Sequence, residues 1–391
     1  MSGPFDDDLV YLDHAASTPM RPEAIAAMTP FLANHPGNPS GGHRASRATK
    51  TALEEARETV AAICGCRPHE VVFTGGGSEG DNLAVKGAAW AARAGDAALD
   101  GVVTTGIEHK AVLGAGDRLA REGFRVVRIP ATADGVVDLD ALGAAVDEHT
   151  AVVSVMLVNN ETGVRQPLDE VACLVRERAP RAVLHTDAVQ APQWLDLAPA
   201  TANAALVAIS GHKFGGPKGV GALIVRDGAT LVPLIEGGGH EWGLRAGTQN
   251  VAGIVAFATA LRVTNERRAE ETARIVGLRD LLERGLEALV PGFTVNGVGA
   301  RRVEGILHCT FDDVEAEILL VALDQQGVMA ASGSACSSGA VDPSHVLLAM
   351  GMPRSRALSS VRFSLGYAST QADIDAALAI VPEVVAKLRV A

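Results

Sequence analysis

Short β-branched runs alternate with amphipathic, helix-like stretches over residues 51–227, and this alternation limits the possible folds of the chain most strongly. The strand-like runs lie at 70–77, 101–106, 124–130, 151–158, 182–188, 205–210 and 221–227, and the helix-like stretches include 51–64, 78–92, 110–122 and 138–148. Strands that alternate with helices favour an α/β fold with a mostly parallel sheet flanked by helices on both faces. Such a sheet binds its ligand at the carboxyl ends of its strands, so residues that follow a strand are the first candidates for a site.

The alternation stops near residue 253, where a long helix-like region continues to about residue 290. Four apolar residues of this region recur at helical spacing and are expected to be buried on one face: Ile275, Leu278, Leu282 and Leu289. A chain of 391 residues is longer than one hydrophobic core usually serves. We therefore expect a large domain over residues 16–260 and a smaller α+β domain built from residues 1–15 and 261–391.

Charge and composition exclude several classes of partner. The net charge is −12 and no run of Lys or Arg occurs, whereas nucleic-acid binding needs a concentrated basic surface. No apolar stretch has membrane-spanning length, and the chain begins with an acidic segment where a signal peptide would be basic and then apolar. The five cysteines are an odd number and widely spread, which suits free thiols in a reducing compartment. We expect a cytoplasmic protein that binds neither nucleic acid nor membrane.

One cysteine differs from the others in its surroundings. Four are expected to be packing residues without a metal-binding role: Cys64, Cys66, Cys173 and Cys309. Cys336 instead lies within "ASGSACSSGA" (331–340), where every neighbour is Ala, Ser or Gly. A structural cysteine usually lies among large apolar side chains. The composition therefore predicts a flexible, solvated loop that presents the Cys336 thiol.

A glycine-rich turn offers a first candidate for ligand binding. Gly75, Gly76 and Gly77 follow a strand-like run and precede a helix-like stretch, whose N-cap is expected to be Ser78. Free N–H groups and the helix dipole attract phosphate at such a position. The turn matches neither the P-loop nor the dinucleotide-binding pattern, so alone it is as consistent with a structural turn as with a binding site.

Three chemically versatile residues lie at or just after the end of a strand-like run: His109, Asp187 and Lys213. Each taken singly is more often structural, but all three are expected at the same edge of the sheet. Loss of hydration beside an apolar strand lowers the pKa of a lysine and makes its amine nucleophilic. Pyridoxal phosphate needs such a lysine, an acid beside its ring nitrogen and a phosphate site. The combination therefore predicts a pyridoxal-phosphate site, with His109 stacking on the ring or moving protons.

The chain resembles cysteine desulfurases of the NifS/IscS type, members of the class V aminotransferase family among the fold-type I pyridoxal-phosphate enzymes. The resemblance runs nearly from end to end, through "YLDHAASTP" (11–19), "VVFTGGGSEGDNLAVKG" (71–87), "EHKAVL" (108–113), "VNNETG" (158–163), "HTDAVQ" (185–190), "SGHKFGGPKGVGAL" (210–223), "EGGGHEWGLRAGT" (236–248), "SGSACSSG" (332–339) and "VRFSLG" (361–366). Two motifs depart from the usual pattern. "GGGS" replaces a glycine-alanine-threonine turn, and "RAGT" replaces arginine-serine-glycine-threonine.

The resemblance implies a conversion of L-cysteine to L-alanine. Lys213 would bond to the cofactor and move protons at the substrate Cα, and His109 would stack on the ring as an acid and base. Arg362, with Asn160, would bind the substrate carboxylate, a task that suits a planar, bidentate donor. Cys336 would attack the substrate sulfur and carry it as a persulfide to an acceptor protein, for example in iron–sulfur cluster or thio-cofactor synthesis.

The resemblance also implies which residues hold pyridoxal phosphate: Gly77, Ser78, Asn160, Asp187, Gln190, Ser210, His212, Lys213 and Thr248. Asp187 would pair with the pyridine nitrogen, and Asn160 and Gln190 would hydrogen-bond the cofactor. Thr248 would complete the phosphate site of the neighbouring subunit, so a homodimer is implied. No metal ligand is expected.

Three other functions stay open on the residues alone: a selenocysteine lyase, a class V aminotransferase and a non-enzymatic sulfur-carrier scaffold. An aminotransferase has no need of a thiol on a glycine-serine loop, and a scaffold has no need of Lys213. The residues do not separate cysteine from selenocysteine as the substrate.

Overall fold

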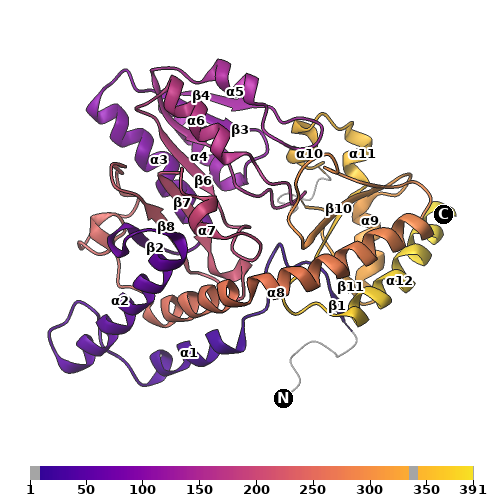
Figure 1. Ribbon diagram of the computed structural model, residues 1–391, viewed down its shortest axis with the longest axis horizontal. Helices are drawn as coiled ribbons and strands as arrows, with labels where there is room; N and C mark the ends of the chain where they lie inside the picture. The colour runs from indigo at the N-terminus through magenta and orange to yellow at the C-terminus, as the bar shows by residue number, and fades with distance from the viewer. Residues whose placement is uncertain (1–8, 334–341, 391) are drawn as a thin grey trace.

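The computed structural model describes residues 9–333 and 342–390, and in Figure 1 a large sheet with its helices lies beside a smaller unit. The large sheet has seven strands in the order β2-β8-β7-β6-β5-β3-β4. The strands are β2 (Val71–Thr74), β3 (Gly101–Thr105), β4 (Arg125–Ile129), β5 (Thr150–Ser154), β6 (Val183–Asp187), β7 (Leu206–Ser210) and β8 (Gly221–Val225). The helices that accompany them are α1 (Pro22–Ala33), α2 (Arg44–Cys64), α3 (Gly77–Gly95), α4 (Lys110–Arg121), α5 (Leu139–Ala145), α6 (Leu168–Arg178) and α7 (Leu197–Ala200).

The expected mostly parallel sheet is confirmed. β3 pairs in parallel with β4 and β5, and the parallel order continues through β6 and β7. Only β8 is reversed among the seven strands described, since it pairs antiparallel with both β2 and β7. β8 follows β7 through a short turn and no crossover helix, which is the connection that an antiparallel pair allows.

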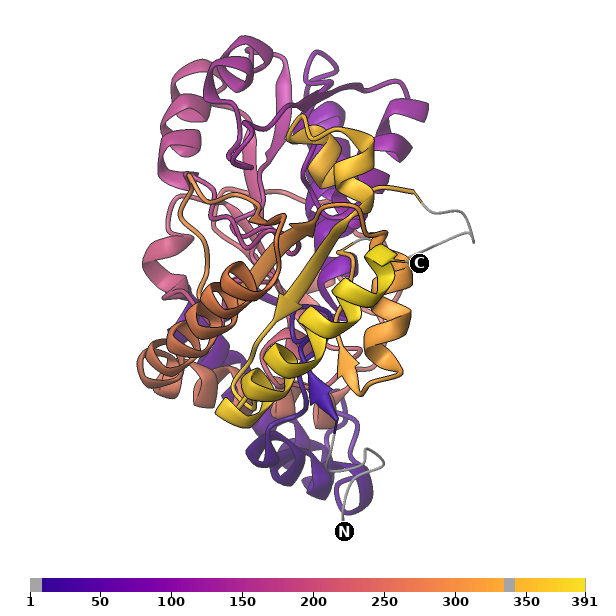
Figure 2. The ribbon, with the colours of Figure 1, turned by 90° about the vertical axis from the view of Figure 1, so that its right-hand side faces the viewer.

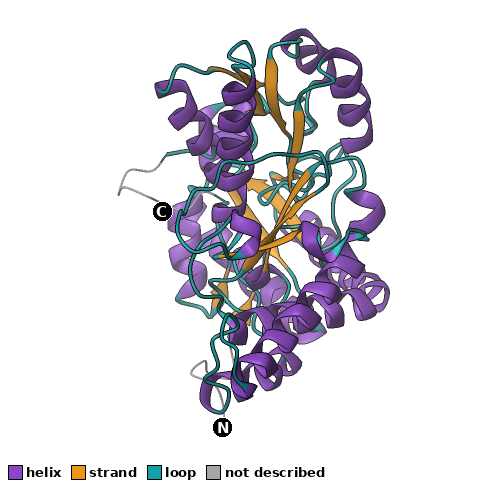
Figure 3. Cartoon of the chain, turned by 90° about the vertical axis from the view of Figure 1, so that its left-hand side faces the viewer, coloured by secondary structure: helices purple, strands orange, loops and turns teal. Residues whose placement is uncertain are grey.

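Helices cover both faces of this sheet, as Figure 3 shows. Successive strand residues point to opposite faces, so Val152 and Val153 of β5 belong to two different hydrophobic clusters. Val152 packs in the cluster that includes α3 and α4, and Val153 packs in the cluster that includes α2, α6 and α8. Because both faces are buried, the strands are continuous apolar runs, which explains why their positions could be predicted.

A long helix, α8 (Val251–Leu289), links the large sheet to the smaller unit. It packs against α1 and α2 and also against α12 (Gln371–Val390), which lies alongside it in Figure 2. Ile275, Leu278 and Leu282 are buried as expected, but the prediction for Leu289 is wrong, because its side chain is 55% exposed. Leu286, one turn beyond Leu282, is buried there instead. Neither α8 nor any other described helix is long and apolar enough to cross a membrane.

The smaller unit contains two further sheets. One has the order β12-β10-β9 and is antiparallel, and the other pairs β1 with β11 in parallel. The elements are β1 (Val10–Tyr11), β9 (Phe293–Val295), β10 (Ile306–Phe311), β11 (Val328–Met329), β12 (Ser360–Ser364), α9 (Ala316–Asp324), α10 (His345–Ala349) and α11 (Arg354–Leu358). β1 thus pairs residues 10–11 with residues 328–329, while the division into residues 16–260 and residues 1–15 with 261–391 stays a prediction.

The described cysteines correct one expectation. Cys64 and Cys309 are buried and Cys66 is half-buried, as packing residues would be. Cys173 is exposed, so its assignment as a packing residue is wrong. The buried face of α6 consists of Leu168, Val171, Ala172 and Val175, and Cys173 lies on the other side of the helix.

A buried ion pair holds the turn around residue 241 against β2. The Glu241 carboxylate accepts hydrogen bonds from Arg57 Nη1 at 2.8 Å and Nη2 at 3.0 Å, and from the Phe73 backbone N–H at 2.9 Å. The side chains of Arg57 and Glu241 are only 3% and 1% exposed. Each charge therefore depends on the other for compensation in the protein interior.

We expect Glu241→Gln to lower the free energy of unfolding by about 3 kcal/mol, because it removes the buried countercharge of Arg57 and leaves only Glu54, which is 40% exposed and 3.2 Å from Arg57 Nε. Urea unfolding monitored by circular dichroism measures this loss. Glu266→Gln is the control, since it removes an exposed partner of Arg262 and is expected to cost less than about 1 kcal/mol. Equal small losses for both variants would contradict the prediction.

Candidate active site

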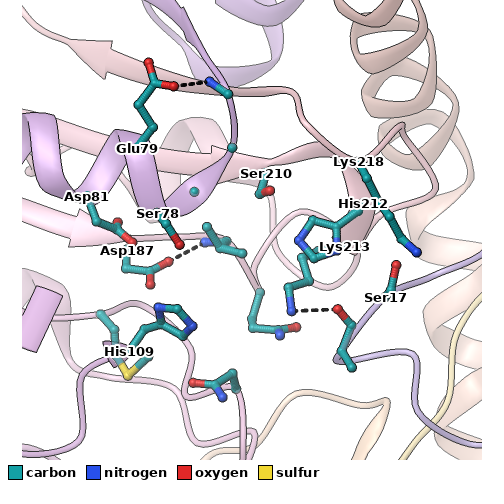
Figure 4. Close-up of a pocket in the computed structure, with 18 of the residues that line it drawn as sticks. Ser17, Ser78, Glu79, Asp81, His109, Asp187, Ser210, His212, Lys213 and Lys218 are labelled. Carbon is teal, nitrogen blue, oxygen red and sulfur yellow. Dashed lines mark hydrogen bonds between the residues drawn. The ribbon is translucent and has the colours of Figure 1, made fainter. Parts of the chain in front are cut away.

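A cavity of about 490 Å³ opens at the carboxyl ends of the parallel strands (Figure 4). Nine residues predicted from the sequence line it: Gly77, Ser78, His109, Asn160, Asp187, Gln190, Ser210, His212 and Lys213. They lie at or after the ends of β2, β3, β5, β6 and β7, so segments far apart in sequence meet because parallel strands end at one edge. In Figure 4, His109 and Asp187 lie on one side of the cavity, and His212 and Lys213 lie on the other.

The glycine-rich turn forms one wall of the cavity. Gly76 has a φ of 143° and is the N-cap of α3, so the expectation that Ser78 caps the helix is wrong. Ser78 lies one residue inside the helix, because the chain enters the helix two residues earlier than the serine suggested. A Cβ atom on Gly77 would lie 2.7 Å from Val189 Cγ2, so a side chain would not fit there without displacement. The helix N-terminus thus keeps the exposed N–H groups that suit an anion.

Asp187 ends β6 and is a fully buried carboxyl group at the base of the cavity. Its Oδ1 accepts a hydrogen bond from the Val189 backbone N–H at 2.9 Å. Burial raises the pKa of Asp187, although the nearby His109 and the Val189 N–H oppose the shift. Burial therefore favours the neutral acid, and a cationic partner in the cavity would stabilise the ionised carboxylate.

His109 is the N-cap of α4, and its Nδ1 accepts a hydrogen bond from the Ala111 backbone N–H at 3.2 Å. Burial lowers the pKa of His109, so the neutral ring is favoured. Because Nδ1 is the acceptor, the proton of the neutral ring is at Nε2. One imidazole atom of His109 and one carboxylate oxygen each of Asp81 and Asp187 lie within 4.8 Å of one another.

Lys213 ends the short 3₁₀ turn after β7, and its Nζ donates to the carbonyl oxygens of Ala15 at 2.6 Å and Ala16 at 3.0 Å. Burial lowers the pKa of the Lys213 amine to about 8, with a further contribution from the charge of Arg362. Asp187 and Asp13 oppose this shift. The amine is therefore far more nucleophilic near neutral pH than an ordinary lysine.

We expect the Lys213 amine of the cofactor-free protein to lose half of its protons near pH 8 rather than near 10.5. The lowered pKa means that the neutral, reactive form increases as the pH rises through 8. The pH dependence of acetylation of the Lys213 peptide, followed by mass spectrometry, measures the midpoint. Arg362→Gln removes a charge that lowers this pKa, so its midpoint is expected to lie higher. A wild-type midpoint above pH 10 would refute the prediction.

The remaining predicted residues lie outside the lining of the cavity or outside the described residues. Arg362 belongs to β12 of the smaller unit, and its Nη1 donates to the carbonyl oxygen of Asn160 at 2.7 Å. Thr248 is exposed and does not line the cavity of its own chain. Cys336 lies in 334–341, outside the residues that the structure describes.

Sequence reasoning missed two acidic residues at this site. Asp13 accepts a hydrogen bond from Arg362 Nη2 at 2.6 Å, and Asp81 is buried against the cavity beside Asp187. Asp13 lies in the matched motif "YLDHAASTP", which was a signal that the segment is near the site. Asp81 lies inside a helix-like stretch, where nothing in the sequence distinguishes it from a surface carboxylate.

The sequence model of the aminotransferase class-V family matches residues 10–377 of the chain. The chain belongs to the class-V aminotransferase family. It is 43% identical over 385 residues to an IscS-like cysteine desulfurase of Mycobacterium tuberculosis, with 97% of each chain covered. Its fold matches a NifS-like protein with a TM-score of 0.90 at 33% identity, covering 97% of this chain and 100% of the other. It also matches SspA in complex with cysteine, with a TM-score of 0.79 at 32% identity. This match covers 92% of this chain and 99% of the other.

Class-V family members depend on pyridoxal phosphate, and the residues of this cavity fit that cofactor. The buried Asp187 carboxylate suits a protonated ring nitrogen, and the neutral His109 imidazole suits a ring stacked beside it. Gly77 leaves the helix N-terminus open for a phosphate, with Ser210 beside it. Lys213 provides an amine of lowered pKa in the same cavity.

Proposed function

We propose that this protein is a cysteine desulfurase, which uses pyridoxal phosphate to convert L-cysteine to L-alanine and transfers the sulfur to Cys336. The observation that carries the proposal is the meeting of His109, Asp187 and Lys213 in one cavity beside a glycine-rich helix N-terminus. The full-length similarity to an IscS-like cysteine desulfurase supports L-cysteine as the substrate. In the overall reaction, L-cysteine and a protein thiol are converted to L-alanine and a protein persulfide.

Pyridoxal phosphate, when bound, withdraws electrons from the Cα atom of the substrate. Residues of four segments would hold it in this proposal. Gly77, Ser78, Ser210 and His212 bind its phosphate, and Asp187 binds its ring nitrogen. Asn160 and Gln190 donate further hydrogen bonds, and the Ala15 carbonyl orients Gln190 by accepting from its Nε2 at 2.7 Å.

Two residues move protons. Lys213 attaches the cofactor through its amine and then holds or releases a proton at the substrate Cα, which its lowered pKa favours. His109 holds a proton at Nε2, because its Nδ1 is engaged by the Ala111 N–H. Both residues thus have the protonation state that an acid or base needs near neutral pH.

Two further residues handle the substrate. Arg362 binds the carboxylate of L-cysteine through its guanidinium, together with Asn160. The Cys336 thiolate attacks the substrate sulfur, the Cβ–S bond breaks, and Cys336 keeps the sulfur as a persulfide. A protein acceptor then removes that sulfur, for iron–sulfur cluster or thio-cofactor synthesis.

The proposal includes a homodimer. Thr248 is exposed and lies outside the lining of its own cavity, so it is free to reach the phosphate site of a second copy. A cytoplasmic location is part of the same proposal, and it agrees with the thiol chemistry, because a reducing compartment keeps a reactive thiol free instead of in a disulfide.

The test is to incubate the purified holoprotein with L-cysteine and a thiol reductant and to quantify L-alanine and sulfide. Equal amounts of the two products are expected, with none from cofactor-free protein. Turnover of L-selenocysteine alone would indicate a selenocysteine lyase. Transfer of the amino group to a keto acid without sulfide would indicate an aminotransferase, and no chemistry with any of these substrates would indicate a carrier scaffold.

A further inference from the structure

We propose that Asp13 is a positioning residue, which orients the Arg362 guanidinium for the substrate carboxylate and so determines the affinity for L-cysteine. The inference rests on the proposed function, in which Arg362 binds that carboxylate. Asp13 belongs to a matched motif, "YLDHAASTP", to whose side chains the proposed function gives no role.

The contacts of Arg362 leave it a single orientation. Its Nη2 donates to Asp13 Oδ1 at 2.6 Å, and its Nη1 donates to the Asn160 carbonyl oxygen at 2.7 Å. The Arg362 side chain is 5% exposed and that of Asp13 is 22% exposed. Nε of Arg362 is buried and has no hydrogen-bond partner among the described residues. The guanidinium is thus held at two nitrogens, and each of these two nitrogens has a second N–H that these contacts do not use.

The backbone holds both partners of this ion pair in register. Residues 12–15 run along the end of β12, where the Ser364 N–H donates to the Leu12 carbonyl at 2.7 Å and the His14 N–H donates to the Ser364 carbonyl at 3.2 Å. Arg362 lies two residues before Ser364 on β12, between β10 and Ala331. A side chain on residue 13 therefore reaches Arg362 without any rearrangement of the backbone.

The same short segment also contacts the cofactor lysine. The carbonyls of Ala15 and Ala16 accept from Lys213 Nζ, so residues 13–16 connect the substrate arginine to the reacting amine. The Asp13 charge also counters the effect of Arg362 on Lys213, whose pKa is lowered by Arg362 and raised by Asp13. Asp13 is therefore placed to control the orientation of the Arg362 guanidinium and the net charge near the Lys213 amine.

An oriented guanidinium binds a carboxylate more strongly than a mobile one, because less conformational freedom is lost on binding. In Asp13→Asn the amide oxygen still accepts a hydrogen bond, but the charge that holds Arg362 is gone. Charge-assisted hydrogen bonds are about twice as strong as neutral ones. Arg362 would then adopt other orientations, and the substrate would have to restore the correct one.

The experiment measures L-cysteine turnover and the equilibrium binding of L-alanine, the product, by calorimetry. In Asp13→Asn we expect KM for L-cysteine and Kd for L-alanine to rise about tenfold, with kcat within about threefold, the change that loss of one charged hydrogen bond produces. Binding of cysteamine, which lacks a carboxylate, is expected to stay unchanged. Asp13→Glu keeps the charge and is expected to restore part of the affinity.

A matched control is Glu283→Gln, which removes the 25%-exposed partner of Arg302 and is expected to leave KM unchanged. The Arg362→Gln variant separates the positioning role of Asp13 from the proposed binding of the substrate carboxylate by Arg362. If Arg362→Gln weakens L-alanine binding and Asp13→Asn does not, the positioning role is wrong and the proposed function stands. If Arg362→Gln leaves L-alanine binding unchanged, Arg362 does not bind the carboxylate, and both assignments fail. Equal weakening of cysteamine binding in Asp13→Asn would also overturn the positioning role.

Discussion

The Cys336→Ala variant is expected to form neither L-alanine nor sulfide from L-cysteine, while its cofactor stays bound. Removal of a reacting nucleophile costs about 10³-fold or more in turnover. Cofactor absorbance is expected to match that of the wild type, because none of the residues proposed to hold pyridoxal phosphate changes. Product assays and absorbance spectra of the same preparations measure both expectations.

The other thiols of the chain explain why no substitute is expected. Burial raises the pKa of Cys64 and Cys309, and it raises the pKa of Cys66 to about 11, so little reactive thiolate forms at neutral pH. Cys173 is exposed, but it lies on α6, none of whose residues lines the cavity. Among the described residues, no thiol lines the cavity.

Cys173→Ser is the matched control, since it removes an exposed thiol and is expected to keep full activity. Continued L-alanine formation in Cys336→Ala would show that Cys336 is not the nucleophile. An elimination of the substrate sulfur without a protein persulfide would then be the better account of the reaction.

The Lys213→Ala variant is expected to lose turnover by about 10³-fold or more, because it removes both the cofactor attachment and the proton carrier at the substrate Cα. Pyridoxal phosphate is still expected to bind, through Asp187 and the residues proposed to bind its phosphate, but without a covalent bond. Reduction with borohydride followed by mass spectrometry distinguishes covalent from non-covalent cofactor, and L-alanine formation measures turnover.

Lys213→Arg tests whether charge alone is sufficient, and it is expected to be as inactive as Lys213→Ala because a guanidinium does not supply the amine. Lys50→Ala, at an exposed position of α2, is the control that keeps activity. A covalent cofactor in Lys213→Ala would place the attachment at another lysine and refute the assignment.

Much of the fold and site could be predicted because the relevant signals are local. Continuous apolar strands and alternating helices showed the mostly parallel sheet, and the residues at or just after the ends of those strands included His109, Asp187 and Lys213. The prediction then required only that parallel strands end at one edge. Errors arose where one residue was judged without its neighbours. Ser78 is a good N-cap by type, but the helix already begins at Gly77, and Cys173 is apolar enough to pack but faces outward.

The sequence by itself determined the order of strands and helices, the identity of the reactive groups and the glycines that leave room for a phosphate. Only the tertiary structure decided how charges from distant segments meet. Asp13 and Arg362 are 349 residues apart in the chain, and their contact exists because residues 12–15 align with β12. The lowered pKa of Lys213 likewise depends on burial and on Arg362. The apolar strand before Lys213 already indicated the loss of hydration, but charge proximity is a property of the packed chain, so no local pattern predicts the contribution of Arg362.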